Sequence, residues 1–69
     1  MLKINLNTKL VLGDTVYSPI SGKSFWIVGL EFKEIYNEII VKLKPVNTSE
    51  ENCFTIRLSG VISYGYCIL

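Results

Sequence analysis

The stretch SFWIVGLEFKEIYNEIIVKLK, residues 24–44, decides the fold, because its second half is compatible with two different secondary structures. Residues 24–32 alternate with the period of two that is typical of a β-strand. Apolar side chains occur on both faces in the first half of this strand, as expected where a bent strand serves two packed layers. Gly29 in its middle permits such a bend. We therefore expect a long, bent strand at the centre of a small sheet.

Residues 31–44 leave two alternatives. Their apolar residues recur at helical spacing, which would give an α+β fold with an amphipathic helix ended by Pro45. The run EIIVKLK at 38–44 is instead rich in β-branched residues and alternates apolar with basic side chains, as strands do. We favour the second alternative, a hairpin with a loop over 33–37 and a new strand from Glu38.

The remaining segments also indicate strands. Period-two alternation or short extended runs occur at residues 2–6, 15–17, 53–58 and 62–68, and the polar stretch 46–52 predicts an exposed loop. A chain of 69 residues is enough for one domain only. The sequence therefore predicts a single all-β domain over residues 1–69, a small barrel of five to six short antiparallel strands.

The two C-terminal strands have a predicted register. If 53–58 and 62–68 form a hairpin around the loop Ser59-Gly60-Val61, one face of the pair is entirely apolar, and a slip by one residue would scatter this set. The same register places Cys53 opposite Cys67. We interpret the pair as reduced thiols that pack as small hydrophobic side chains.

The composition points away from catalysis. The chain has no histidine, no phosphate-binding glycine loop and no nucleophile motif, and Asp14 has the context of a turn residue that bonds nearby backbone amides. We expect no catalytic residue, no metal site and no cofactor, and hence no enzyme. The longest apolar stretch is too short for a bilayer, and the N-terminus lacks the features of a secretory signal, so we expect a cytoplasmic protein.

A protein-binding module is the leading functional hypothesis. The sequence has more large aromatic residues than a core of this size needs, and exposed aromatics are common anchors of protein interfaces. A weak nucleic-acid-binding barrel and a self-associating structural or virion protein, including a homodimer, are the alternatives. The net charge of +1 argues against nucleic acid. The candidate binding residues are Tyr17, Trp26, Tyr36, Lys42, Lys44, Arg57 and Tyr64.

The pattern Gly13-Asp14-x-Val16-x-Ser18-Pro19-x-x-Gly22 resembles a group of small uncharacterised proteins from bacteriophages and gut bacteria. Phe54, Gly60 and the end Cys67-Ile68-Leu69 extend the similarity. Ser59 replaces the usual Asp of the group, and no Phe-Pro closes the chain. The resemblance implies an SH3-like barrel, which usually has a short 3₁₀ turn and a sharp change of direction between its last two strands. It also implies a phage-encoded adaptor or inhibitor of a host defence protein, acting in the host cytoplasm.

Overall fold

The ambiguous stretch forms a β-hairpin in the computed structural model of the chain. Strand β3 (Lys23–Lys33) pairs antiparallel with β4 (Glu38–Pro45) through a turn over residues 34–37. Asn37 adopts φ 51°, a left-handed conformation that asparagine tolerates better than most residues do. The expected hairpin is therefore confirmed, and the amphipathic helix over 31–44 is wrong. The β-branched run of β4 lies in a sheet ladder, where such side chains pack well.

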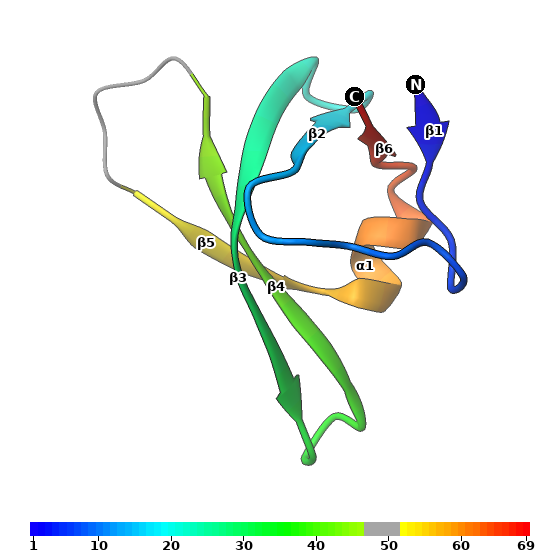
Figure 1. Cartoon of the computed structure of the whole chain (residues 1–69), viewed down its shortest axis with the longest axis vertical. Coiled ribbons are helices and arrows are strands. Elements are labelled where there is room, and N and C mark those ends of the chain that lie inside the picture. Colours follow the sequence, from blue (N-terminus) through cyan, green and yellow to red (C-terminus); the bar gives the residue numbers. More distant parts are fainter. Residues whose placement is uncertain (47–51) are drawn as a thin grey trace.

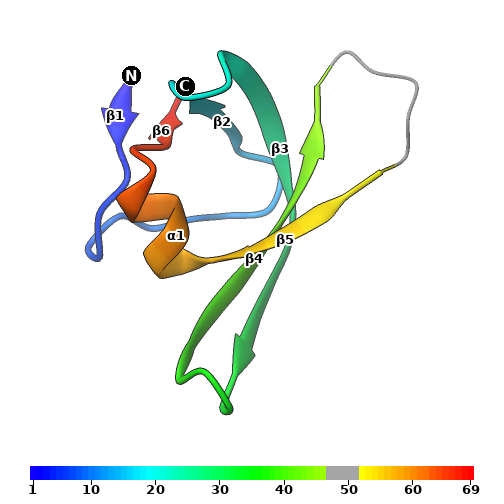
Figure 2. The same ribbon diagram turned by 180° about the vertical axis from the view of Figure 1, so that it is seen from behind.

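The structure describes residues 1–46 and 52–69, and most of the loop expected over 46–52 lies outside them. The described elements, in chain order, are β1 (Leu2–Lys3), β2 (Thr15–Ser18), β3, β4, β5 (Phe54–Arg57), α1 (Leu58–Ser63) and β6 (Cys67–Ile68). They form one open six-stranded antiparallel sheet in the order β1-β6-β2-β3-β4-β5 (Figures 1 and 2). The predicted all-β class is thus confirmed.

A β-bulge divides β3 at Gly29. The register with β4 runs Ile27↔Leu43 and then Gly29↔Lys42, so one extra residue is inserted in β3. Such an insertion bends the strand and increases its twist. A Cβ on Gly29 would lie 3.0 Å from Cβ of Lys42, which is closer than side-chain carbons normally approach. The absence of a side chain at position 29 therefore allows the bend and the close contact together.

The core lies on the inner face of the curled sheet, which α1 and the segment between β1 and β2 cover (Figure 1). Its aromatic part is formed by Phe25, which is in edge-to-face contact with Phe54 at 5.3 Å and tilted against Tyr66 at 6.2 Å between ring centroids. The buried apolar residues are Ile4, Val16, Phe25, Ile27, Val41, Leu43, Val61 and Tyr66.

The predicted C-terminal hairpin is wrong, because residues 58–63 form α1 and not a turn and a strand. The helix ends in a Schellman motif: the N–H of Tyr66 donates to Val61 O, and the N–H of Gly65, at φ 74°, donates to Ile62 O. Gly65 thus ends a helix where the alternating pattern indicated a continuous strand.

The two cysteines are therefore not neighbours across a hairpin. Cys67 in β6 lies opposite Lys3 and Tyr17, while Cys53 precedes β5 at the other end of the sheet order. Both thiols are free and half-buried. The predicted register, which placed Cys53 opposite Cys67, is wrong because α1 contains residues that the prediction assigned to the loop and to the second strand of the hairpin.

Gly29→Ala is expected to lower the free energy of unfolding by about 1–3 kcal/mol, the usual cost of adding a carbon where a strand pair is already in close contact. Urea denaturation followed by circular dichroism measures this change. Val28→Ala, which removes exposed carbons next to the bulge and adds none, is the control and should stay within about 1 kcal/mol of the wild type. Equal stability of Gly29→Ala and the wild type would show that the close contact does not constrain the bulge.

Candidate binding site

Most of the predicted binding residues share one face of the sheet. Because side chains alternate along a strand and cross-strand partners share a face, the registers place them on the side opposite the core. Trp26 pairs with Lys44, Lys42 pairs with Thr55, and Arg57 pairs with Ile40, all across neighbouring strands. We call the surface made by Tyr17, Trp26, Lys42, Lys44, Thr55, Ile40 and Arg57 the outward face.

Trp26 is the single tryptophan of the chain and is 41% exposed on this face. Val28 is also exposed, whereas Phe25 before Trp26 and Ile27 after it are buried in the core. The Lys42 side chain lies across Gly29, since its Cβ, Cγ and Cδ are the atoms nearest to the place that a Cβ at position 29 would take. Aromatic and aliphatic surface is thus exposed beside the stem of Lys42.

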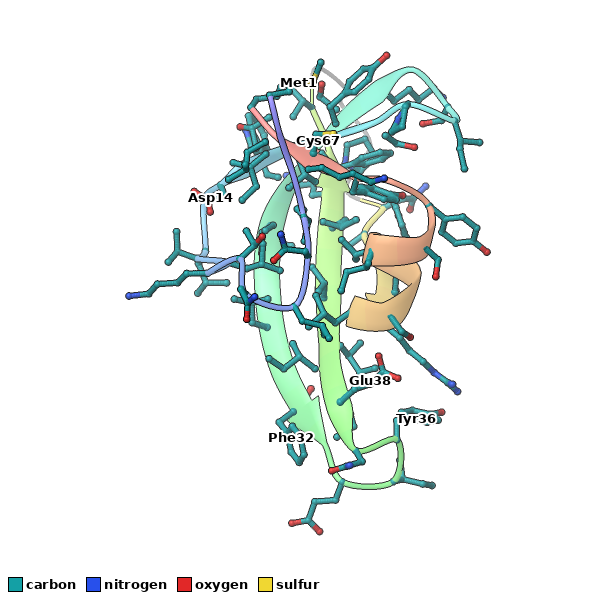
Figure 3. All side chains as sticks on the ribbon, turned by 90° about the vertical axis from the view of Figure 1, so that its right-hand side faces the viewer. Met1, Asp14, Phe32, Tyr36, Glu38 and Cys67 are labelled. Carbon is teal, nitrogen blue, oxygen red and sulfur yellow. The ribbon has the colours of Figure 1, made fainter. Side chains whose placement is uncertain are left out.

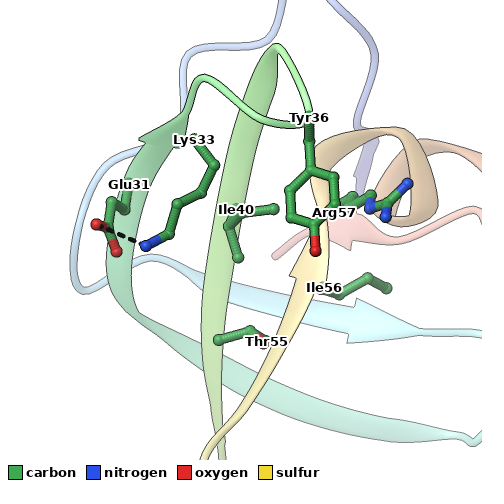
Figure 4. A pocket seen from close by; sticks show the side chains of 7 residues that line it. All are labelled: Glu31, Lys33, Tyr36, Ile40, Thr55, Ile56 and Arg57. Atoms are coloured by element: carbon green, nitrogen blue, oxygen red, sulfur yellow. Dashed lines mark ion pairs between the residues drawn. The ribbon is translucent and has the colours of Figure 1, made fainter.

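Arg57 and Tyr36 contact each other at one end of the outward face. The Arg57 guanidinium carbon lies 4.0 Å from the centre of the Tyr36 ring, a cation–π contact between the end of β5 and the β3–β4 turn. The two side chains line a groove of about 400 Å³ with Glu31, Lys33, Ile40, Thr55 and Ile56 (Figure 4). Lys33 and Glu31 form an ion pair of 3.0 Å at its rim.

Glu38 supplies the N-terminal cap that α1 does not provide for itself. Arg57, at the N-cap position, makes no side-chain cap, and the first turn of α1 has no acidic residue. The backbone N–H of Ser59 donates to Glu38 Oε1 at 3.0 Å, from a strand remote in sequence (Figure 3 shows Glu38 beside the helix). The hydrogen bonds from Ser59 and, to a smaller extent, the charge of Arg57 lower the pKa of Glu38 below its ordinary value of 4.5.

Tyr64 lies apart from the other predicted binding residues. It is the C-cap residue of α1 and lines a second groove of about 310 Å³, which is mainly apolar. The other residues of this groove are Ser18, Ile20, Ser21, Phe25, Phe54 and Tyr66. Tyr64 therefore does not lie on the outward face with Trp26 and Arg57, and its predicted role in binding would belong to this second groove.

Sequence reasoning missed the apolar end of the β3–β4 hairpin. Phe32 and Ile39 form a cross-strand pair and are 57% and 38% exposed, and Ile35 in the turn is 85% exposed. The hairpin extends beyond the rest of the sheet, so these residues have no core to pack against (Figures 1 and 3). The alternation around Phe32 and Ile39 predicted that they are buried. How far the hairpin extends past the core depends on the packing of the other elements, and the local sequence does not show it.

Within residues 1–46 and 52–69, no group of three or more His, Cys, Asp or Glu side chains is arranged to hold a metal ion. The Asp14 carboxylate accepts a hydrogen bond from the backbone N–H of Val11 at 3.3 Å, which confirms its predicted role in a turn. In the part of the chain that the structure describes, the helix is too short to cross a bilayer.

Comparison of the chain with protein-family models, with curated proteins and with solved structures gives no match. The similarity to small phage and gut-bacterial proteins therefore stays a prediction.

Glu38→Gln is expected to reduce the acid sensitivity of folding. Because the pKa of Glu38 is lower in the folded chain than in the unfolded one, its stabilising effect is complete above pH 4.5 and is lost as the pH falls through the folded value. Thermal melts are recorded between about pH 3 and pH 7. The fall in Tm from the neutral to the acidic end of this range should be smaller for Glu38→Gln than for the wild type. Glu34→Gln in the exposed turn is the control, and an equal effect of both variants would contradict the capping role.

Proposed function

We propose that the protein is a non-catalytic protein-binding module that docks on its partner through the outward face. The observation that carries this proposal is the presence of Trp26, Tyr36 and Arg57 around one surface, with Arg57 stacked on Tyr36. Tryptophan, tyrosine and arginine are the residues most enriched among those that contribute most to binding energy in protein interfaces.

The sheet makes this surface suitable for binding with little loss of entropy. Trp26 and Arg57 project from strands whose backbones are held by ladder hydrogen bonds on β4, and the Arg57 side chain is already ordered against Tyr36. An interface built from preordered side chains needs less free energy to immobilise them on binding. The groove beside Tyr36 gives a partner side chain a concave place to enter.

Nucleic-acid binding is the second candidate, because Lys42, Lys44 and Arg57 share the outward face with Tyr17 and Trp26. Aromatic and basic residues together are typical of surfaces that bind single strands. We favour a protein partner because the net charge of the chain is only +1, and affinity for nucleic acid rises with the number of phosphates neutralised.

Self-association is the third hypothesis. The exposed Phe32, Ile35 and Ile39 at the end of the hairpin and the terminal strands β1 and β5 of the open sheet favour it. The resemblance to phage proteins makes a host protein the preferred kind of partner, with the module acting as an adaptor or as an inhibitor of host defence in the host cytoplasm.

Trp26→Ala is expected to lower the affinity for the partner by about 30-fold or more, the effect of truncating a central interface residue. The partner is first captured from bacterial lysate on the immobilised wild-type protein and identified by mass spectrometry. Its dissociation constant is then measured with both proteins purified. Tyr64→Ala and Ile20→Ala on the second groove are the controls and should bind as the wild type does.

Two results would contradict the proposal. One is the absence of any protein that binds the purified module saturably; the other is a partner whose affinity falls with Tyr64→Ala and not with Trp26→Ala. A light-scattering mass of the free protein tests the third hypothesis, since a stable homo-oligomer that captures nothing would support self-association in its place.

A further inference from the structure

Within the described residues, Lys42, Lys44 and Arg57 of the outward face form no ion pair with an acidic side chain. Among residues 1–46 and 52–69 the one ion pair is that of Lys33 with Glu31. Glu38, the acidic residue whose charge acts on Arg57, is engaged by the Ser59 N–H of α1. In this part of the chain, no carboxylate therefore lies within ion-pair distance of Lys42, Lys44 or Arg57.

Lys44 and Lys42 have the spacing of alternate residues in one strand, and Arg57 on the neighbouring strand is a diagonal neighbour of Lys42, about 7–8 Å away. Lys44 and Lys42 are alternate residues of β4, and Arg57 of β5 lies opposite Ile40, the next outward position. Alternate residues of a strand are separated by about 6.5–7 Å. An extended peptide repeats its own alternate side chains at the same interval, so successive carboxylates on one of its faces can meet successive cations.

Two of the three cations lie against other parts of the sheet before any ligand binds. The face of the Arg57 guanidinium rests on Tyr36, and its N–H donors project from the edge of the group, where a carboxylate can accept two of them. The stem of Lys42 lies over Gly29. Trp26, directly across from Lys44, offers apolar surface beside the charges.

We infer that the outward face binds an extended acidic segment of the partner protein, with carboxylates at Arg57, Lys42 and Lys44 and an apolar side chain against Trp26. The inference rests on the proposed function and specifies the chemistry of the partner. We choose this occupant because its carboxylates are opposite in charge to the three cations and recur at a similar spacing along an extended chain. Strand addition at the edge of β5 would need only backbone groups and would leave the ordered Arg57 unused.

A synthetic acidic peptide tests the inference with the native Trp26 as reporter. The probe is an extended peptide of about six residues, alternating Glu with Val or Thr and spanning ~20 Å, with blocked ends. Its titration at low and near-physiological salt is followed by Trp26 fluorescence and by calorimetry. The same peptide with Gln in place of Glu, and a single-stranded oligonucleotide of equal charge, serve as the comparison ligands.

The inference predicts that the Glu peptide binds and that the Gln peptide binds at least about 10-fold more weakly, since charge-assisted hydrogen bonds are lost. Arg57→Gln should weaken binding by about 10-fold or more, and Arg57→Lys by less, because it keeps the charge but loses the two-pronged contact. Lys9→Gln is the control, since it makes the same change of charge in the segment between β1 and β2 and should leave binding unchanged.

Three results with a peptide that binds would overturn the inference. They are equal binding of the Glu and Gln peptides, loss of binding that is the same for Lys9→Gln and Arg57→Gln, and an oligonucleotide that binds more tightly than the Glu peptide with a steep dependence on salt. If the peptide does not bind up to about 1 mM, where the binding free energy is only about −4 kcal/mol, the inference also fails. A captured partner sensitive to Trp26→Ala would then still support the proposed function.

Discussion

The pairing of β3 with β4 across the bulge at Gly29 is the constraint on which the rest of the structure depends. Before the bulge, Phe25 and Ile27 face the core and Trp26 faces outward; after it, Leu30 continues the inner face opposite Val41. One inserted residue thus bends the strand while both of its halves keep an apolar inner side. The same insertion brings Lys42 over Gly29, so the bend that shapes the core also positions a cation outside it.

Helix α1 connects the two ends of the sheet order. It follows directly on β5 at one edge, and its Schellman motif turns the chain back so that β6 can pair with β1 and β2 at the other side. Val61 of the helix and Tyr66 just after it are both buried, and thus the reversal is stabilised by the core itself. The N-terminal end of the helix is capped by Glu38 from the hairpin, which ties α1 to the hairpin that carries Tyr36.

The outward face and the core are two consequences of one alternation. Each residue directed inward places its neighbour outward, and the paired strands bring Trp26 beside Lys44 and Arg57 beside Ile40. The binding hypothesis depends on this coupling, because none of these outward residues is needed to fill the core. The apolar end of the hairpin and the groove around Tyr64 are separate from the outward face. Self-association through the hairpin end can therefore be tested independently of binding at the outward face.

Local sequence determined the all-β class, the central hairpin from Glu38 and the bend at Gly29, because alternation and turn residues act over a few neighbouring positions. It also sufficed to nominate Trp26, Lys42, Lys44 and Arg57. The tertiary structure alone decided that residues 58–63 are helical, that Cys53 and Cys67 are not cross-strand neighbours, and that Arg57 stacks on Tyr36. Val61 and Tyr66 are compatible with a helix that ends in a Schellman motif and also with a strand. Both side chains are buried in the core, and this packing decides in favour of the helix.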